Sequence, residues 1–215
     1  MIKHLKFKTT NNSTVFFFSD FHAKHNKDFI LNPRGFKSAD EGMEALINNW
    51  NSKVSNEDTA FLLGDTVVGA GQDSEKVFKE ILSRLNYKEL YIMPGNHFAG
   101  FKQIFEREIC TSEIDDYYRL PFIVNYSKIV SIIPNYYEIF VDGQFIVLSH
   151  YPIYSWRDIG HGSYMLHGHT HAKINGKLKG RILDLGPESI GNFPLSFQEI
   201  KKIMDVKEIE SPDYH

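Results

Sequence analysis

The sequence predicts an α/β fold in which two mixed β-sheets pack together with helices on the outside, a four-layer α/β/β/α sandwich. In the first half of the chain, short apolar runs alternate with amphipathic stretches in the order βαβαβ, which is typical of a parallel sheet covered by helices. In the second half, several short strands follow one another, and Asp142-Gly143 marks a hairpin turn. A helix-rich half joined to a hairpin-rich half favours a two-sheet sandwich over a barrel.

Three apolar runs in the first half predict strands at 15–18, 59–63 and 90–93. Between them, Ser38 and Glu41 form a capping box that predicts the start of a helix. A second helix is expected between the second and third strands. The apolar faces of these two helices recur at helical spacing and consist of Met43, Leu46, Ile47 and Trp50 in the first and Phe78, Ile81, Leu82 and Leu85 in the second.

The second half predicts a series of short strands and one final helix. The strands are expected at 129–133, 136–141, 145–148, 165–167 and 182–185. Near the end, Ser196 and Glu199 form another capping box. The helix that follows should turn Ile200, Ile203 and Met204 inward.

Composition predicts one soluble domain that spans residues 1–215. The hydrophobic share of 42% and the charged share of 24% are ordinary, and the net charge of −3 argues against a polybasic nucleic-acid binder. The single cysteine, Cys110, cannot form an intramolecular disulfide, which suits a reducing compartment. No apolar stretch is long enough for a signal peptide or a membrane span. We therefore expect a cytoplasmic protein that does not contact the membrane.

Polar side chains follow the predicted strands at a recurring place, the end of the strand. They are Asp20, His22, Asp65, Asn96, His97, His150, His169 and His171. Ligands of open α/β sheets bind beyond the carboxyl ends of the strands, so these groups should meet at one rim. Gly64, Gly95 and Gly168 precede them, where the chain must turn sharply. Imidazole, carboxylate and amide donors suit manganese, iron, cobalt, nickel or zinc, and the lack of thiolates argues against a cysteine-rich structural zinc site.

Five pieces of sequence, in this order, resemble the calcineurin-like metallophosphoesterases, and within them the compact single-domain enzymes of bacteria and phages. They are Asp20-Phe21-His22, Gly64-Asp65, Gly95-Asn96-His97, His150 and Gly168-His169-Thr170-His171. The resemblance implies that seven side chains bind two divalent metal ions: Asp20, His22 and His171 the first, Asn96, His150 and His169 the second, and Asp65 both. It also implies that His97 is not a ligand but donates a proton to the leaving oxygen or stabilises charge on the phosphoryl group.

The implied activity is hydrolysis of phosphate esters, with metal-bound hydroxide as the nucleophile and manganese as the first choice of metal over iron, zinc, nickel and cobalt. We expect a small substrate, with nucleotides as a candidate class, and a diester in preference to a monoester. A phosphomonoesterase, a nuclease and a catalytically silent scaffold are the alternatives. The acidic balance of the chain disfavours long nucleic acid, and the oligomeric state is left open.

The chain departs from its relatives in two places. Phe98 stands where many of them have an acidic residue after the Gly-Asn-His, so another carboxylate, such as Asp28 or Asp73, would have to orient His97. The segment Leu183-Asp184-Leu185-Gly186 replaces an Asn-Val-Gly.

Other polar or aromatic residues near these motifs have competing interpretations. His25 either contacts substrate phosphate or is an exposed loop residue, and His167 is expected to support a metal ligand. Tyr151 is interpreted as a core residue. Lys24, Lys27, Arg34 and Arg157 could reach a phosphate, with solvated charge as the alternative.

Overall fold

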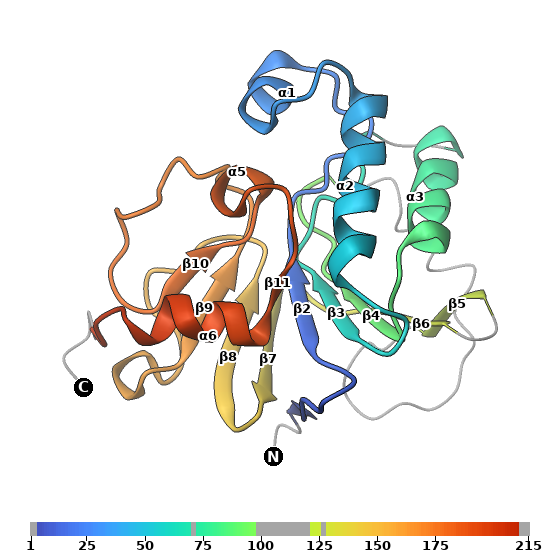
Figure 1. Cartoon of the computed structure of the whole chain (residues 1–215). Coiled ribbons are helices and arrows are strands. Elements are labelled where there is room, and N and C mark those ends of the chain that lie inside the picture. The colour runs from blue at the N-terminus through green and yellow to red at the C-terminus, as the bar shows by residue number, and fades with distance from the viewer. Residues whose placement is uncertain (1–3, 70–71, 98–120, 126–127, 211–215) are drawn as a thin grey trace.

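The structure is a computed structural model, and it describes residues 4–69, 72–97, 121–125 and 128–210. Two mixed β-sheets pack together and helices flank them, which confirms the predicted α/β sandwich (Figure 1). Within the described residues one sheet has six strands in the order β11-β2-β3-β4-β6-β5, and the other has five in the order β1-β7-β8-β9-β10. That the whole chain forms one domain stays a prediction.

The six-stranded sheet is built mainly from the first half of the chain. Its strands are β2 (Val15–Phe18), β3 (Thr59–Leu62), β4 (Glu89–Ile92), β5 (Pro121–Asn125), β6 (Lys128–Ile132) and β11 (Leu195–Ser196). Strands β2, β3, β4 and β6 run parallel, whereas β5 and β11 are antiparallel edge strands. Helices α2 (Ala39–Lys53) and α3 (Gln72–Arg84) cover its outer face. The helix faces predicted from the sequence pack there against Phe16 and Phe18.

The five-stranded sheet comes from the second half of the chain and the N-terminal strand. It consists of β1 (Leu5–Phe7), β7 (Tyr136–Val141), β8 (Gln144–Ser149), β9 (Tyr164–His167) and β10 (Ile182–Asp184). Strands β7 and β8 form the antiparallel hairpin expected around Asp142-Gly143. The core between the sheets contains Phe17 and Phe61 on one side and Ile146 and Leu166 on the other. Trp156 and Ile159 cover the outer face of the five-stranded sheet. Ile159 begins the short 3-10 helix η1 (Ile159–His161).

Helix α6 (Phe197–Asp205) confirms one sequence prediction and corrects another. Its capping box is complete, because Ser196 Oγ accepts from Glu199 N at 3.3 Å and Glu199 Oε2 accepts from Ser196 N at 2.8 Å. Phe197, Ile200 and Met204 are buried, but Ile203, predicted to face inward, is 37% exposed. At 3.6 residues per turn Ile203 lies on the flank of the stripe that the other three form.

The box at the start of α2 is only half formed. Ser38 Oγ accepts from Glu41 N at 3.1 Å, but the Glu41 carboxylate accepts from Lys37 N instead. In the part of the chain that the structure describes, no helix has the length and apolar character needed to cross a lipid bilayer.

The register of the parallel strands aligns their carboxyl ends. Phe18, Leu62 and Ile92 are paired neighbours at the ends of β2, β3 and β4, and Leu148 is paired with Leu166 near the ends of β8 and β9. The loops that follow are joined across the sheets by main-chain hydrogen bonds, for example from Ser19 N to Leu185 O. Short helices α1 (Asp28–Arg34) and α5 (Pro187–Ile190) lie above these loops at the top of Figure 1.

Candidate metal centre

The polar residues at the strand ends meet around the carboxylate of Asp65. Asp65 Oδ2 lies 3.4 Å from His150 Nε2, 3.7 Å from His22 Nε2 and 3.9 Å from His97 Nε2. The other oxygen, Oδ1, accepts from the backbone N–H of His97 at 2.9 Å. Side chains from the loops after β2, β3, β4 and β8 thus converge on one carboxylate, as the sequence predicted.

Asp20, His22 and His171 form one group whose ligand atoms all lie within 4.8 Å of one another. Asp20 Oδ1 and both ring nitrogens of His22 are buried and have no hydrogen-bond partner among the described residues. Leaving buried polar atoms unsatisfied is costly, and a bound cation would satisfy the carboxylate oxygen and one imidazole nitrogen. The donor set therefore fits a divalent metal ion.

Asp65, His150 and His169 form a second group with the same 4.8 Å limit. Asn96 lies between the two imidazoles, since its Oδ1 is 2.9 Å from both His150 Nε2 and His169 Nδ1. His22, Asp65 and His97 form a third group, so His97 is within ligand distance as well. Because Asp65 and His22 each belong to two groups, the three groups are contiguous.

The backbone at five of these residues is left-handed. The φ angles are 53° at Asp20, 52° at His22, 51° at Asp65, 69° at His169 and 47° at His171. Left-handed backbone is uncommon outside glycine and clusters at functional sites. Hydrogen bonds between the loops hold these turns, for example from His22 N to Asp65 O at 2.9 Å.

The ionisation of Asp20, Asp65 and His22 suits cation binding, whereas contacts with carboxylates raise the pKa values of His150 and His171 in spite of their burial. Burial opposes ionisation of Asp20, but His22 and His150 beside it lower the pKa of that carboxyl below its ordinary value. Burial likewise opposes ionisation of Asp65, and the contact with His150 again lowers the pKa. Burial lowers the pKa of His22 in spite of the adjacent carboxylates, and it lowers that of His25 to about 4. Ionised carboxylates next to neutral imidazoles are the state in which these side chains bind metals.

Behind the site lies a buried ion pair that the sequence did not reveal. Arg34, expected to be either a phosphate contact or a solvated charge, is 6% exposed, and its Nε donates to Glu188 Oε1 at 2.9 Å. The solvated charge is wrong, because α1 turns Arg34 inward toward α5, and the phosphate contact stays a prediction. The same Glu188 oxygen lies 2.9 Å from His171 Nδ1.

Of two further side chains, Tyr151 differs from its sequence interpretation, whereas Arg157, whose side chain is 51% exposed, agrees with the alternative of a solvated charge. Tyr151, interpreted as core, is 41% exposed, and its ring centroid lies 4.6 Å from that of His169 and 5.0 Å from that of His150. It follows His150 directly, in the loop that leaves β8, and so stands at the rim. Arg157 is bound to Glu138 at 2.9 Å.

His167 and His25 both contact residues of the loops that form the site. His167 is buried, and its Nδ1 lies 2.8 Å from Gly168 O. The ring of His25 packs edge-on against that of His22, with centroids 5.4 Å apart. Phe98 and Cys110 lie outside the described residues. The carboxylate of Asp65 lies near the ring of His97, with Oδ2 3.9 Å from Nε2. That Asp28 or Asp73 orients this ring stays a prediction.

Gly168 carries a prediction for the site. A Cβ added there would lie 1.9 Å from Ser19 Oγ and 2.2 Å from Asp20 Oδ2. Gly168→Ala should therefore displace Asp20, weaken metal binding and lower the free energy of unfolding by about 1–3 kcal/mol. Isothermal titration with Mn²⁺ and urea unfolding of the metal-free protein measure the two effects. Gly176→Ala is the control for metal affinity, because nothing lies within 4 Å of the added Cβ, although φ of 75° makes an alanine there strained as well. Wild-type metal affinity in Gly168→Ala would contradict the prediction.

Comparison with known proteins agrees with this geometry. Residues 13–173 match the family model of the calcineurin-like phosphoesterases. An uncharacterized protein of Methanocaldococcus jannaschii is 25% identical over 198 residues, which cover 89% of this chain and 91% of the relative. A protein of unknown function from Aquifex aeolicus shares the fold, with a TM-score of 0.59 at 22% identity over 89% of this chain and 100% of the other.

A more distant match is YfcE, a phosphoesterase from E. coli, with a TM-score of 0.37 at 15% identity over 85% of this chain and 81% of the other. The family match spans most of the chain and includes every strand end that brings a side chain to the three ligand groups. The chain therefore belongs to the calcineurin-like phosphoesterase family, and it is a metal-dependent hydrolase of phosphate esters.

Proposed function

We propose that the chain is a phosphodiesterase that binds two divalent cations and acts on a small, nucleotide-type substrate. The observation that carries the proposal is the position of Asp65, whose Oδ2 lies 3.7 Å from His22 on one side and 3.4 Å from His150 on the other. A carboxylate shared in this way can bridge two cations about 3.5–4 Å apart. The mixed nitrogen and oxygen donors fit manganese first, with iron, zinc, nickel and cobalt as alternatives.

In this proposal Asp20, His22 and His171 hold one cation, Asn96, His150 and His169 hold the other, and Asp65 holds both. When bound, divalent cations supply Lewis acidity, which acidifies water and offsets negative charge on the phosphoryl group. The side chains themselves set the positions of the cations, and the left-handed turns aim the donors inward.

His97 is proposed to protonate the leaving oxygen. Its backbone N–H is held by Asp65 Oδ1 at 2.9 Å, and its side chain is 36% exposed at the rim of the site. The residue is therefore anchored through its backbone, and its ring is partly open to substrate. An alkoxide is a poor leaving group and gains most from a proton donor, and the preference for a diester over a monoester is part of this proposal.

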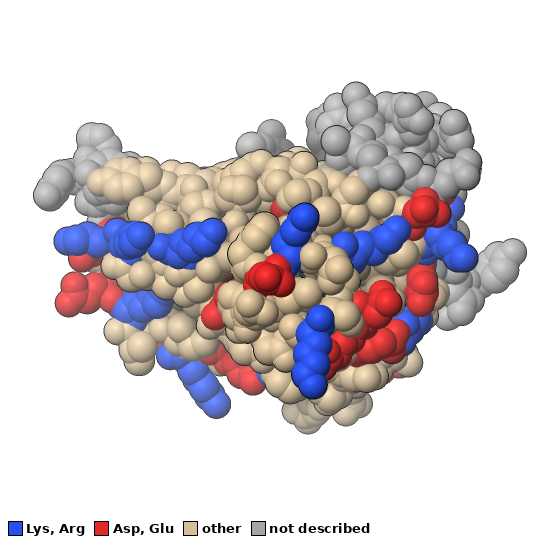
Figure 2. Space-filling view, turned by 90° about the horizontal axis from the view of Figure 1, so that it is seen from above, with Lys and Arg blue, Asp and Glu red and all other residues tan. Residues whose placement is uncertain are grey.

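The face that carries the site supports a small substrate over long nucleic acid. Figure 2 shows this end of the molecule from above, and in its coloured part Lys and Arg side chains are interspersed with Asp and Glu. Duplex binding depends on a continuous basic surface that neutralises many phosphates. The sequence analysis expects a cytoplasmic protein that does not contact the membrane, and both expectations remain predictions.

A substrate panel tests the proposal. Hydrolysis of bis-p-nitrophenyl phosphate, p-nitrophenyl phosphate, a cyclic nucleotide, a dinucleotide and a DNA duplex should be compared with Mn²⁺, Fe²⁺, Co²⁺, Ni²⁺, Zn²⁺ or Mg²⁺ added to metal-free protein. We expect the highest kcat/KM on small diesters, with Mn²⁺. Preference for the monoester would identify a phosphomonoesterase, and preference for duplex a nuclease. Metal-replete protein without turnover of any ester would favour a silent scaffold.

A further inference from the structure

We propose that Glu188 is a positioning residue that fixes the ring of His171, and that Arg34 in turn fixes Glu188. The inference rests on the proposed role of His171 as a ligand of the first cation. Neither residue belongs to the motifs at the strand ends, and they come from two short helices, α1 and α5, that lie above the site.

The contact between Glu188 and His171 is short and shielded from solvent. Glu188 Oε1 lies 2.9 Å from His171 Nδ1, and the two side chains are 5% and 17% exposed. A carboxylate accepts hydrogen bonds and cannot donate one, so Nδ1 must carry the hydrogen. In the neutral ring the lone pair is then on Nε2, which leaves that nitrogen to bind a cation beside Asp20 and His22. Glu188 thereby selects both the tautomer and the rotation of the ring.

Arg34 holds Glu188 in place. Its Nε donates to the same Oε1 at 2.9 Å, and its Nη1 donates to Phe21 O at 3.1 Å. Asn192 Nδ2 donates to the backbone carbonyl of Arg34 at 3.0 Å, which ties the end of α1 to the segment after α5. The positive charge of Arg34 also compensates the buried negative charge of Glu188. Without such a partner, burial of the carboxylate would carry a large desolvation free energy. The contacts form a continuous path from the loop after β2, through Arg34 and Glu188, to His171.

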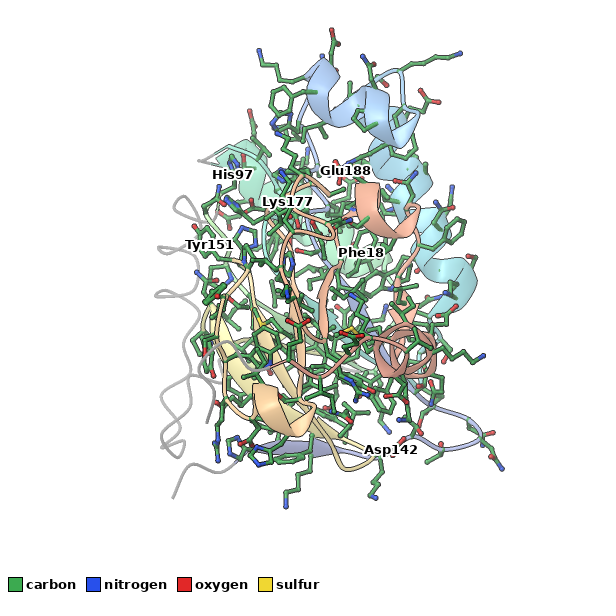
Figure 3. The ribbon with its side chains drawn as sticks, turned by 90° about the vertical axis from the view of Figure 1, so that its left-hand side faces the viewer. Phe18, His97, Asp142, Tyr151, Lys177 and Glu188 are labelled. Atoms are coloured by element: carbon green, nitrogen blue, oxygen red, sulfur yellow. The ribbon has the colours of Figure 1, made fainter. Side chains whose placement is uncertain are left out.

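The other oxygen of Glu188 lies close to Asp20. Oε2 is buried without a hydrogen-bond partner among the described residues. A Cβ built on Gly186 would lie 3.4 Å from this oxygen and 3.6 Å from Asp20 Oδ2, so the two carboxylates flank the same glycine. Figure 3 shows Glu188 in the upper half of the molecule, in which His97 and Tyr151 also lie. Glu188 is therefore a member of the site's surroundings, and its contact with His171 supports the orientation of a proposed ligand.

Glu188→Gln tests the inference, with metal affinity and the tautomer of His171 as readouts. Titration of Mn²⁺ into metal-free protein should show one of two binding steps weakened about 10–100-fold, the range typical for loss of a residue that supports a ligand. Histidine ¹⁵N NMR of metal-free protein, at a pH high enough for the ring of His171 to be neutral, should show its Nδ1–H form in the wild type and a mixture of tautomers in the variant. A purely structural role would leave the tautomer unchanged.

Two matched variants separate the outcomes. Glu199→Gln removes another carboxylate that is paired with a basic side chain, Lys53, at a helix remote from the site, and it should leave both readouts unchanged. Arg34→Lys keeps a charge for Glu188 and should fall between wild type and Glu188→Gln. Each variant is assayed at a temperature where circular dichroism shows it folded. If wild type binds two ions and Glu188→Gln binds both equally well, only this inference fails; if wild type binds none, the proposed function fails as well.

Discussion

Asp65→Asn is expected to lower kcat/KM on small diesters by about 1000-fold, because an amide cannot bridge two cations as a carboxylate does and about 4 kcal/mol of transition-state stabilisation is lost. Affinity for the second divalent ion should fall with it. The fold should tolerate the change, since asparagine accepts the left-handed backbone that Asp65 adopts, with φ at 51°. Steady-state kinetics, Mn²⁺ titration and circular dichroism measure the three effects.

Asp142→Asn is the matched control for this prediction. Asp142 also has left-handed backbone, with φ at 49°, but it lies in the β7–β8 hairpin and accepts hydrogen bonds from Thr9. Figure 3 places it at the opposite end of the molecule from His97 and Glu188. The Asp142→Asn variant should retain wild-type kcat/KM. An Asp65→Asn enzyme with more than a tenth of wild-type activity would contradict the shared-carboxylate arrangement.

His97→Ala should reveal its effect through the leaving group. On a dinucleotide, whose leaving alkoxide needs a proton, kcat should fall about 100- to 10,000-fold, the usual contribution of a general acid. On the p-nitrophenyl ester of thymidine 5′-phosphate, whose leaving group is stable as an anion, the fall should be much smaller. Kinetics on the two substrates, side by side, measure the difference.

Metal titration decides between the two roles that the geometry allows His97. Its ring nitrogen lies within 4.8 Å of ligand atoms of His22 and Asp65, so a ligand role would also lower activity. If His97 is a proton donor and not a ligand, the His97→Ala variant keeps a Mn²⁺ affinity close to that of wild type. Loss of affinity together with equal losses on both substrates would replace the proton donor with a ligand. His161→Ala, at an exposed residue of η1, should change neither measurement.

Local pattern explains why most of the fold could be predicted. Each of the eight strands expected from apolar runs is present, with ends within one residue of the expected ones. The candidate ligands followed from the same pattern, because parallel strands in register deliver whatever follows them to one edge. Strand β1, with three residues, carries too little periodicity to be recognised. Helix α1 escaped because it has seven residues and contains Pro33, which normally argues against a helix interior.

The surroundings of the site depend on contacts that sequence spacing does not encode. Arg34 and Glu188 are 154 residues apart and meet only after α1 and α5 have packed above the loops. An arginine on a short polar stretch looks like a solvated charge until its partner is known. Tyr151 follows a buried histidine and resembles a core residue in the sequence, but the loop that leaves β8 turns it outward.

The left-handed backbone of the site limits which substitutions its ligands can accept during evolution. The residues concerned are Asp20, His22, Asp65, His169 and His171. Apart from glycine, the residues that enter such backbone most readily are asparagine, aspartate and histidine. The same three supply oxygen and nitrogen donors for divalent metals. Glutamate would preserve the carboxylate donor at Asp20 or Asp65 but would meet resistance from the left-handed main chain. Retuning the enzyme for another metal is thus confined to exchanges within this small set, unless whole loops are replaced.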